Sequence, residues 1–135
     1  MAKEEITTSE WQIMEALWAE HAPLTSSEVY KRLQRNVKMS QRMVRVLMNR
    51  LCQKGVLGYK VDERDLRVYH YYAQKSREEC VKEKSRKFVD SYFSGSGTNA
   101  MAALLQSYDL TDEQIEELEE ILEKSRDRGA DPKKG

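Results

Sequence analysis

Histidine and cysteine are scarce in this chain, which has two of each among its 135 residues. Cys52 and Cys80 do not form the closely spaced pairs that bind zinc or exchange disulfides. His21 and His70 stand in no metal-binding or nucleophile motif, and the carboxylates of residues 116–120 read as a solvated helix face. The sequence therefore predicts no catalytic residue, no metal site and no cofactor.

Long apolar runs are also missing. No stretch of about 18 apolar residues, the length that spans a bilayer, occurs in the chain. Met1–Glu5 is not followed by the apolar segment of a signal peptide. We therefore expect a cytoplasmic protein without a membrane partner. With 39% hydrophobic and 34% charged residues, a small core under a highly charged surface is predicted.

The net charge is zero, but the charge is unevenly distributed. The stretch from Lys31 to Arg67 holds 11 basic and 3 acidic residues, whereas residues 76–135 hold 10 basic and 14 acidic ones. A polyanion responds to the local field more than to the total charge. The basic stretch is thus a candidate nucleic-acid surface, with a merely solvated basic face as the alternative.

Sequence signals for the starts and ends of helices occur along the whole chain. Three capping boxes begin at Thr7, Thr25 and Thr111, and Ser40 is expected to cap a further helix that ends at Lys54-Gly55. The first helix should bury Trp11 and Trp18 and stop near Ala22-Pro23, before a short extended piece at Leu24. Further helices are predicted over 75–93 and 99–107, separated by the break at 94–97, and from Thr111 onward.

A β-hairpin follows the third helix. Residues 56–61 and 66–73 are rich in Val and Tyr and flank the polar segment 62–65. Helix, strand-like piece, helix, helix and hairpin is the order of a winged helix-turn-helix. The predicted fold class is mainly α with a small β wing, with a DNA-binding domain at 1–74, helical dimerisation domain at 75–126 and disordered tail at 127–135.

The third helix is the predicted reading element. Its apolar side, with Val44, Leu47, Met48 and Leu51, should pack inward, so the opposite side faces out. Arg and Asn side chains on one helix match base edges in the major groove of double-stranded DNA. The hairpin tip can reach neighbouring phosphates, although Asp62, Glu63 and Asp65 within it weaken the case for that contact. The predicted DNA-binding residues are Ser40, Gln41, Arg42, Met43, Arg45, Val46, Asn49 and Arg50 on the helix, and Lys60, Arg64 and Arg67 around the hairpin tip.

The C-terminal helices are predicted to form a homodimer. A short isolated helix pair cannot bury the apolar stripe from Ile115 to Leu122, and two-fold pairing is the common solution. The predicted dimerisation residues are Phe88, Tyr92, Phe93, Leu104, Leu105, Ile115, Leu118, Ile121 and Leu122.

Several segments together resemble one family. Residues 10–18 (EWQIMEALW) are similar to the opening helix of the penicillinase repressor (BlaI/MecI/CopY) family. Ser40, Val44 and the stretches 49–51 and 54–58 resemble its recognition helix and first wing strand, 67–71 its second wing strand and 111–122 its last helix. The resemblance implies a dimeric repressor on an inverted-repeat operator of the TACA…TGTA type.

The chain departs from the family pattern in three places. Met43 and Val46 stand where the family often has threonines, which implies a different operator. No cysteine follows Cys80, so the copper-binding motif of one branch is absent. The Asn-Phe cleavage site of another branch aligns with Ala103-Leu104. An inducer or protease partner is thus left unidentified. The rival hypotheses are a winged helix for protein contacts and a regulator that binds a small molecule.

Overall fold

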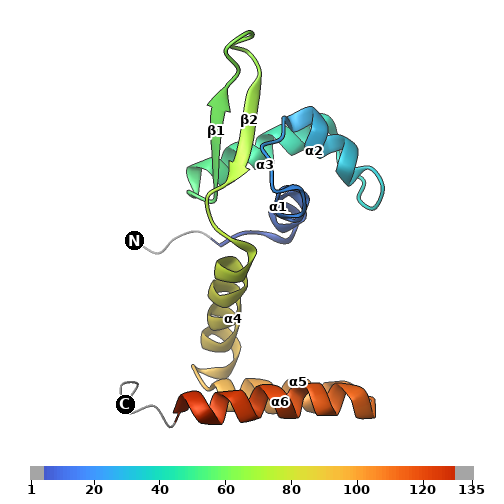
Figure 1. Ribbon diagram of the computed structural model, residues 1–135, viewed down its shortest axis with the longest axis vertical. Coiled ribbons are helices and arrows are strands. Elements are labelled where there is room, and N and C mark those ends of the chain that lie inside the picture. Colours follow the sequence, from blue (N-terminus) through green and yellow to red (C-terminus); the bar gives the residue numbers. More distant parts are fainter. Residues whose placement is uncertain (1–4, 130–135) are drawn as a thin grey trace. The chain divides into compact units, whose positions relative to one another are not determined.

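The computed structural model describes residues 5–129, which form six helices and a two-stranded antiparallel sheet (Figure 1). The elements are α1 (Thr8–Glu20), α2 (Ser26–Leu33), α3 (Gln41–Gln53), β1 (Leu57–Val61), β2 (Tyr69–Ala73), α4 (Arg77–Phe93), α5 (Gly97–Ser107) and α6 (Asp112–Gly129). The predicted class, mainly α with a small β wing, is confirmed.

Between Arg86 and Lys87 the chain divides into two compact units, here called the winged-helix unit and the C-terminal unit. The boundary lies inside α4. Residues 127–129 of the expected tail belong to α6, and 130–135 lie outside the described residues. Residues 1–4 of the stretch that was predicted not to be a signal peptide also lie outside them. Among residues 5–129 no helix combines the length and apolar content needed to cross a membrane.

The predicted capping boxes begin three of the helices. Thr7 Oγ1 accepts a hydrogen bond from Glu10 N (3.2 Å), and Glu10 Oε1 accepts one from Thr7 N (2.8 Å). Thr25 with Glu28, and Thr111 with Gln114, form the same reciprocal pair. Each pair satisfies two N–H groups that the helix itself leaves without an acceptor, so these starts are fixed by local sequence.

The core of the winged-helix unit lies where α1, α2, α3 and the base of the hairpin meet. The predicted inner stripe of α3 is confirmed, because all four of its residues are buried. Trp11 and Trp18 are half-buried against this core, with their rings edge to face at 5.2 Å. The fully buried large side chains of the unit include Ile13, Met14, Val29, Val44, Met48, Leu51 and Leu57.

The hairpin pairs Leu57 with Ala73, Tyr59 with Tyr71 and Lys60 with His70. The extended piece at Leu24 is confirmed, since its N–H and C=O both bond to Tyr71 across 2.9 and 2.8 Å. Residues 66–68, predicted as strand, belong to the turn instead. Asp62 N donates to Val68 O, and Val68 N donates to Asp65 O. These two hydrogen bonds hold residues 62–68 in a turn, so β2 begins only after Val68.

The C-terminal unit has little core of its own. Among residues 87–129 only Ala100 is buried. α5 begins at Gly97, two residues earlier than predicted, because Ser96 Oγ caps it by accepting from Asn99 N. The break before it is made by Ser94 (φ 50°) and Gly95 (φ 83°) in the left-handed region. Apolar side chains on these helices are therefore left at the surface.

Candidate nucleic-acid interface

The outward side of α3 carries arginines that no acid neutralises. All eight predicted DNA-binding residues of this helix and its cap are exposed: Ser40, Gln41, Arg42, Met43, Arg45, Val46, Asn49 and Arg50. Among residues 5–129 no carboxylate forms an ion pair with any of the three arginines. Five N–H donors per guanidinium therefore remain for an external acceptor.

The start of α3 differs from those of α1, α2, α4 and α6, which each place an acid in the first turn. α3 has none there. Ser40 Oγ caps it by accepting from Met43 N (3.0 Å), but the N–H groups of Gln41 and Arg42 have no acceptor within residues 5–129. Free N–H groups together with the positive end of the helix dipole favour an anion at this point.

The surroundings of this helix start are also basic. A hollow of about 450 Å³ beside it is lined by residues that include Lys38, Ser40, Met43 and Arg50. The Gln41 side chain, predicted to contact DNA, donates through Nε2 to Ser27 Oγ at 3.0 Å. This bond connects the beginnings of α2 and α3, so Gln41 contributes to positioning α3.

Asp62 and Asp65 accept hydrogen bonds that stabilise the hairpin turn. Asp62 Oδ1 accepts from Arg64 N (2.7 Å) and Asp65 N (3.2 Å), while Asp62 Oδ2 lies 3.0 Å from His70 Nε2. The bond from His70, aided by these backbone donors, holds the pKa of Asp62 below its ordinary value. Asp65 accepts from both the backbone and the guanidinium of Arg67, which lowers its pKa likewise.

The three predicted wing cations are therefore not equivalent. Arg67 is engaged with Asp65, whereas Lys60 and Arg64 have no acidic partner among residues 5–129. Successive residues of a strand point to opposite faces. Lys60 and its partner His70 thus lie on one face of the hairpin, and Tyr59 and its partner Tyr71 lie on the other.

The tyrosine face of the hairpin was not among the predicted site residues. Tyr59 and Tyr69 stack with ring centroids 4.8 Å apart and an interplanar angle of 16°, and both are exposed. The signal was present in the sequence, because residues 59, 69 and 71 share one face once the register is known. Of these three tyrosines Tyr71 is buried in the core, whereas Tyr59 and Tyr69 remain at the surface.

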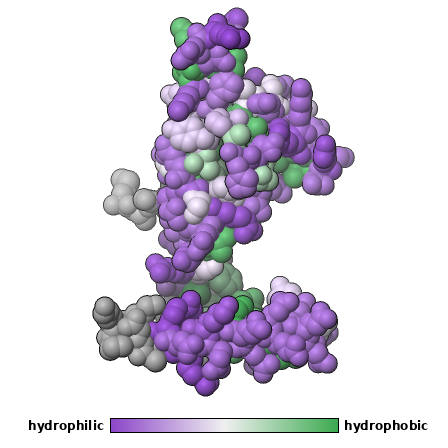
Figure 2. Space-filling model, in the orientation of Figure 1, coloured by the Kyte–Doolittle hydropathy of each residue, from purple (hydrophilic) through white to green (hydrophobic). Residues whose placement is uncertain are grey.

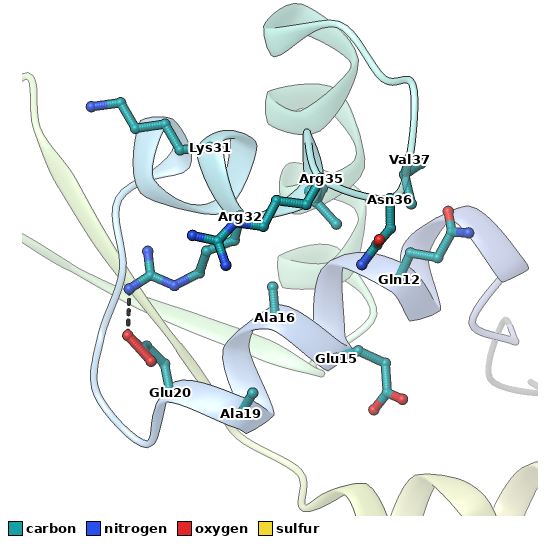
Figure 3. A pocket seen from close by; sticks show the side chains of 11 residues that line it. Gln12, Glu15, Ala16, Ala19, Glu20, Lys31, Arg32, Arg35, Asn36 and Val37 are labelled. Atoms are coloured by element: carbon teal, nitrogen blue, oxygen red, sulfur yellow. Dashed lines mark hydrogen bonds and ion pairs between the residues drawn. The ribbon is translucent and has the colours of Figure 1, made fainter.

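A groove of about 840 Å³ lies between α1 and the end of α2 (Figure 3). Ala16 and Ala19 form its floor, and Arg35 extends over it. Both acids that line it are paired with arginines, Glu20 with Arg32 and Glu15 with Arg77. Lys31 and Arg35 have no such partner among residues 5–129, so the groove adds to the positive potential of the unit.

The cysteines are not activated. Burial raises the pKa of the Cys52 thiol, and burial followed by the nearby Glu83 raises that of Cys80. Only thiolates react readily, so neither side chain has the environment of a redox sensor. No group of three His, Cys, Asp or Glu residues within 5–129 is arranged to hold a metal ion.

The predicted dimerisation residues lie in the C-terminal unit. Phe93 and Leu118 are half-buried, and the other seven are exposed. Met101 and Tyr108, which were not predicted, are exposed to 61% and 67%. The hydrophobic positions on α5 and α6 lie among strongly hydrophilic ones (Figure 2). So many uncovered large apolar side chains in a unit without a core mark a surface for another chain.

Comparison with known proteins agrees with this arrangement. Residues 6–124 match the model of the penicillinase repressor family. The chain is 26% identical over 124 residues to the penicillinase repressor of Bacillus licheniformis, covering 92% of this chain and 94% of that one. It is 25% identical over 120 residues to the methicillin resistance regulatory protein MecI of Staphylococcus aureus, covering 89% and 94%.

A solved structure shows the same fold. The DNA-binding protein BpsR of Bordetella bronchiseptica aligns with a TM-score of 0.50 and 19% identity, over 79% of this chain and 82% of that one.

Proposed function

Because the chain belongs to the penicillinase repressor family, we propose that it is a homodimeric transcriptional repressor that binds an inverted-repeat operator in double-stranded DNA. The family consists of repressors and is not a class of enzymes. The observation that carries the proposal is the outward face of α3, where Arg42, Arg45 and Arg50 are exposed and have no acidic partner among residues 5–129.

α3 is the reading helix. The major groove accepts one α-helix, and Arg and Asn side chains hydrogen-bond there to guanine and adenine edges. Arg42, Arg45 and Asn49 supply these donors, while Met43 (47% exposed) and Val46 (39%) supply apolar contact for thymine methyl groups. Because neither of the last two donates a hydrogen bond, the preferred operator differs from TACA…TGTA at the positions that they face.

The first turn of α3 fixes the protein on the DNA backbone. A phosphate fits the free N–H groups of Gln41 and Arg42, and Lys38 and Arg50 add positive charge beside the same hollow. Such contacts set position and orientation without reading sequence. Together with the base contacts of α3 they explain why a protein of zero net charge binds a polyanion.

Dimerisation is assigned to the C-terminal helices. Their exposed apolar residues, among them Tyr92, Leu105, Ile121 and Leu122, gain a partner when two copies pair. A two-fold dimer presents two reading helices to half-sites about 34–36 Å apart, one turn of DNA. Occupation of such a site over a promoter blocks transcription. This role places the protein in the bacterial cytoplasm.

The test is a binding titration with the purified full chain. Labelled TACA…TGTA palindrome and a scrambled duplex of equal composition are compared across a salt series, with stoichiometry measured at saturation. We expect two chains per palindrome, tighter binding to it than to the scrambled duplex, and a slope of log K against log salt of about −0.9 per neutralised phosphate.

Other results would identify the rival functions. Equal binding to both duplexes would retain DNA binding and assign another operator, which selection from random duplexes would then reveal. No binding to either duplex at low salt would overturn the proposal in favour of a winged helix for protein contacts. Affinity that depends on a co-purified small molecule would favour the ligand-responsive regulator.

A further inference from the structure

We propose that the wing contacts DNA through its tyrosine face, with the hydroxyls of Tyr59 and Tyr69 donating hydrogen bonds to backbone phosphates. The cations around the hairpin tip then play a secondary part. This inference rests on the proposed function and names the residues by which the wing takes part in it.

The two tyrosines form a preorganised pair. Their rings stack at 4.8 Å, and each lies within 6.3 Å of the buried ring of Tyr71. The pair is therefore anchored at the hairpin base and exposed above it, at 48% for Tyr59 and 39% for Tyr69. Rings that are already ordered lose little conformational entropy when they bind.

The tyrosine face lies on the side of the hairpin that packs against the core. Tyr71 belongs to the same buried cluster as Leu47 and Leu51 of α3, and α3 contacts β1 directly. The rings of Tyr59 and Tyr69 extend from Tyr71 along this side, whereas Lys60 and His70 lie on the opposite one. In the proposed complex a duplex held by α3 meets the tyrosine side of the wing.

The hydroxyls of Tyr59 and Tyr69 are available as donors. Neither has a hydrogen-bond partner within the described chain, from residue 5 to residue 129. Tyrosine is among the side chains that bond to phosphate oxygens in protein–DNA complexes. A phenol donates without carrying charge, so its contact releases no counterion from the DNA.

The hairpin tip is poorly suited to the same task. It carries three acids, Asp62, Glu63 and Asp65, and its exposed Leu66, at 74%, is apolar. Figure 2 shows apolar surface near this end of the hairpin. The Arg67 guanidinium is already paired with Asp65. Arg64 has no acidic partner among residues 5–129, but the neighbouring acids weaken its attraction to phosphate.

DNA is the favoured occupant over a protein partner because of the surrounding charge. The segment 31–67, which includes α3 and β1, carries 11 basic and 3 acidic residues, and Arg45 on α3 is exposed. An apolar patch in so basic a segment complements a sugar–phosphate backbone, where rings cover the deoxyribose and hydroxyls reach the phosphate.

The experiment compares Tyr59→Phe, Tyr69→Phe and the double variant with Tyr72→Phe as the matched control. Tyr72 occupies the same hairpin on the opposite face. Phenylalanine keeps the ring stack and removes only the hydroxyl. We expect each of the two variants to bind DNA about tenfold more weakly, on palindrome and scrambled duplex alike, with Tyr72→Phe at wild-type affinity and all melting temperatures similar.

The salt series separates this contact from a cationic one. The loss from Tyr59→Phe and Tyr69→Phe should leave the slope of log K against log salt unchanged, whereas Arg64→Ala reduces it by about 0.9 if Arg64 contacts a phosphate. Wild-type affinity for both tyrosine variants, with a loss for Arg64→Ala, would overturn the inference and leave DNA binding intact. Failure of the wild-type protein to bind either duplex would overturn both proposals.

Discussion

Lys54 Nζ, just after the end of α3, donates a hydrogen bond of 2.6 Å to Glu10 Oε1 in the first turn of α1. Only 9% of the Lys54 side chain and 1% of the Glu10 side chain are exposed. The same ammonium donates to Glu5 O (2.7 Å), and Glu10 Oε2 has no hydrogen-bond partner in the part of the chain that the structure describes. The end of the reading helix is thus joined to the start of α1 by a buried ion pair.

We expect Lys54→Met to destabilise the fold by about 3 kcal/mol, because it leaves a buried carboxylate without a counter-charge. Urea unfolding of the full chain measures this. The double variant Glu10→Gln with Lys54→Met is the control and should recover part of the loss, since no charge then remains buried. A single variant as stable as the wild type would show that the pair contributes nothing.

The same pair predicts acid sensitivity. Burial acts to raise the pKa of Glu10, but the bonds from Lys54 and Thr7 outweigh it and hold that pKa below the ordinary value of 4.5. The stabilisation from this group is present above pH 4.5 and is lost as the pH falls through the folded-state pKa. Below pH 4.5 the stability of the wild type should decline more steeply than that of Glu10→Gln, and parallel curves would contradict this assignment.

Arg42 lies on the exposed side of α3, opposite the buried stripe. If Arg42 reads a base, Arg42→Ala should cost about 1–3 kcal/mol on the operator and much less on scrambled duplex. Fluorescence anisotropy with both duplexes measures the difference. Lys82→Ala is the control for lost charge, since Lys82 is an exposed cation on α4 with a partner in Glu78. An equal loss on both duplexes would reassign Arg42 to phosphate contact.

Leu118→Asp and Leu122→Asp should each shift the protein from dimer to monomer in sedimentation experiments, because a carboxylate cannot be buried unpaired in an apolar interface. DNA affinity should fall with the dimer population and recover at higher protein concentration. Glu119→Gln on the same helix is the control. A Leu118→Asp protein that stays dimeric would remove Leu118 from the interface.

Local signals account for what the sequence predicted well. The capping boxes at Thr7, Thr25 and Thr111 and the four-residue stripe of α3 operate within a few residues, so their outcome follows from spacing alone. The helix starts at α4 and α5 were each misplaced by two residues. That of α4 depends on Ser76 and Glu79, where each side chain accepts a hydrogen bond from the backbone N–H of the other residue. This pattern is also local and could have been recognised in the sequence.

The sequence-based predictions were wrong or incomplete where side chains interact with residues that are more distant along the chain. Asp62 holds residues 62–68 in a compact turn through hydrogen bonds with two backbone N–H groups and with His70. β2 therefore begins at Tyr69, three residues later than the Val and Tyr content of residues 66–73 suggests. The pairing of Glu10 with Lys54 spans 44 residues. Neither partner is specified by the periodicity around the other, and the same holds for the register that separates Tyr59 from Lys60.

The absence of an acid from the first turn of α3 has a consequence for charge. α1, α2 and α6 each place a carboxylate of their own beside the positive end of the helix dipole, whereas α3 is capped by the neutral hydroxyl of Ser40 alone. A negative charge at a helix start is stabilising. A bound phosphate would therefore supply to the reading helix the charge that the other three helices carry in their own sequence.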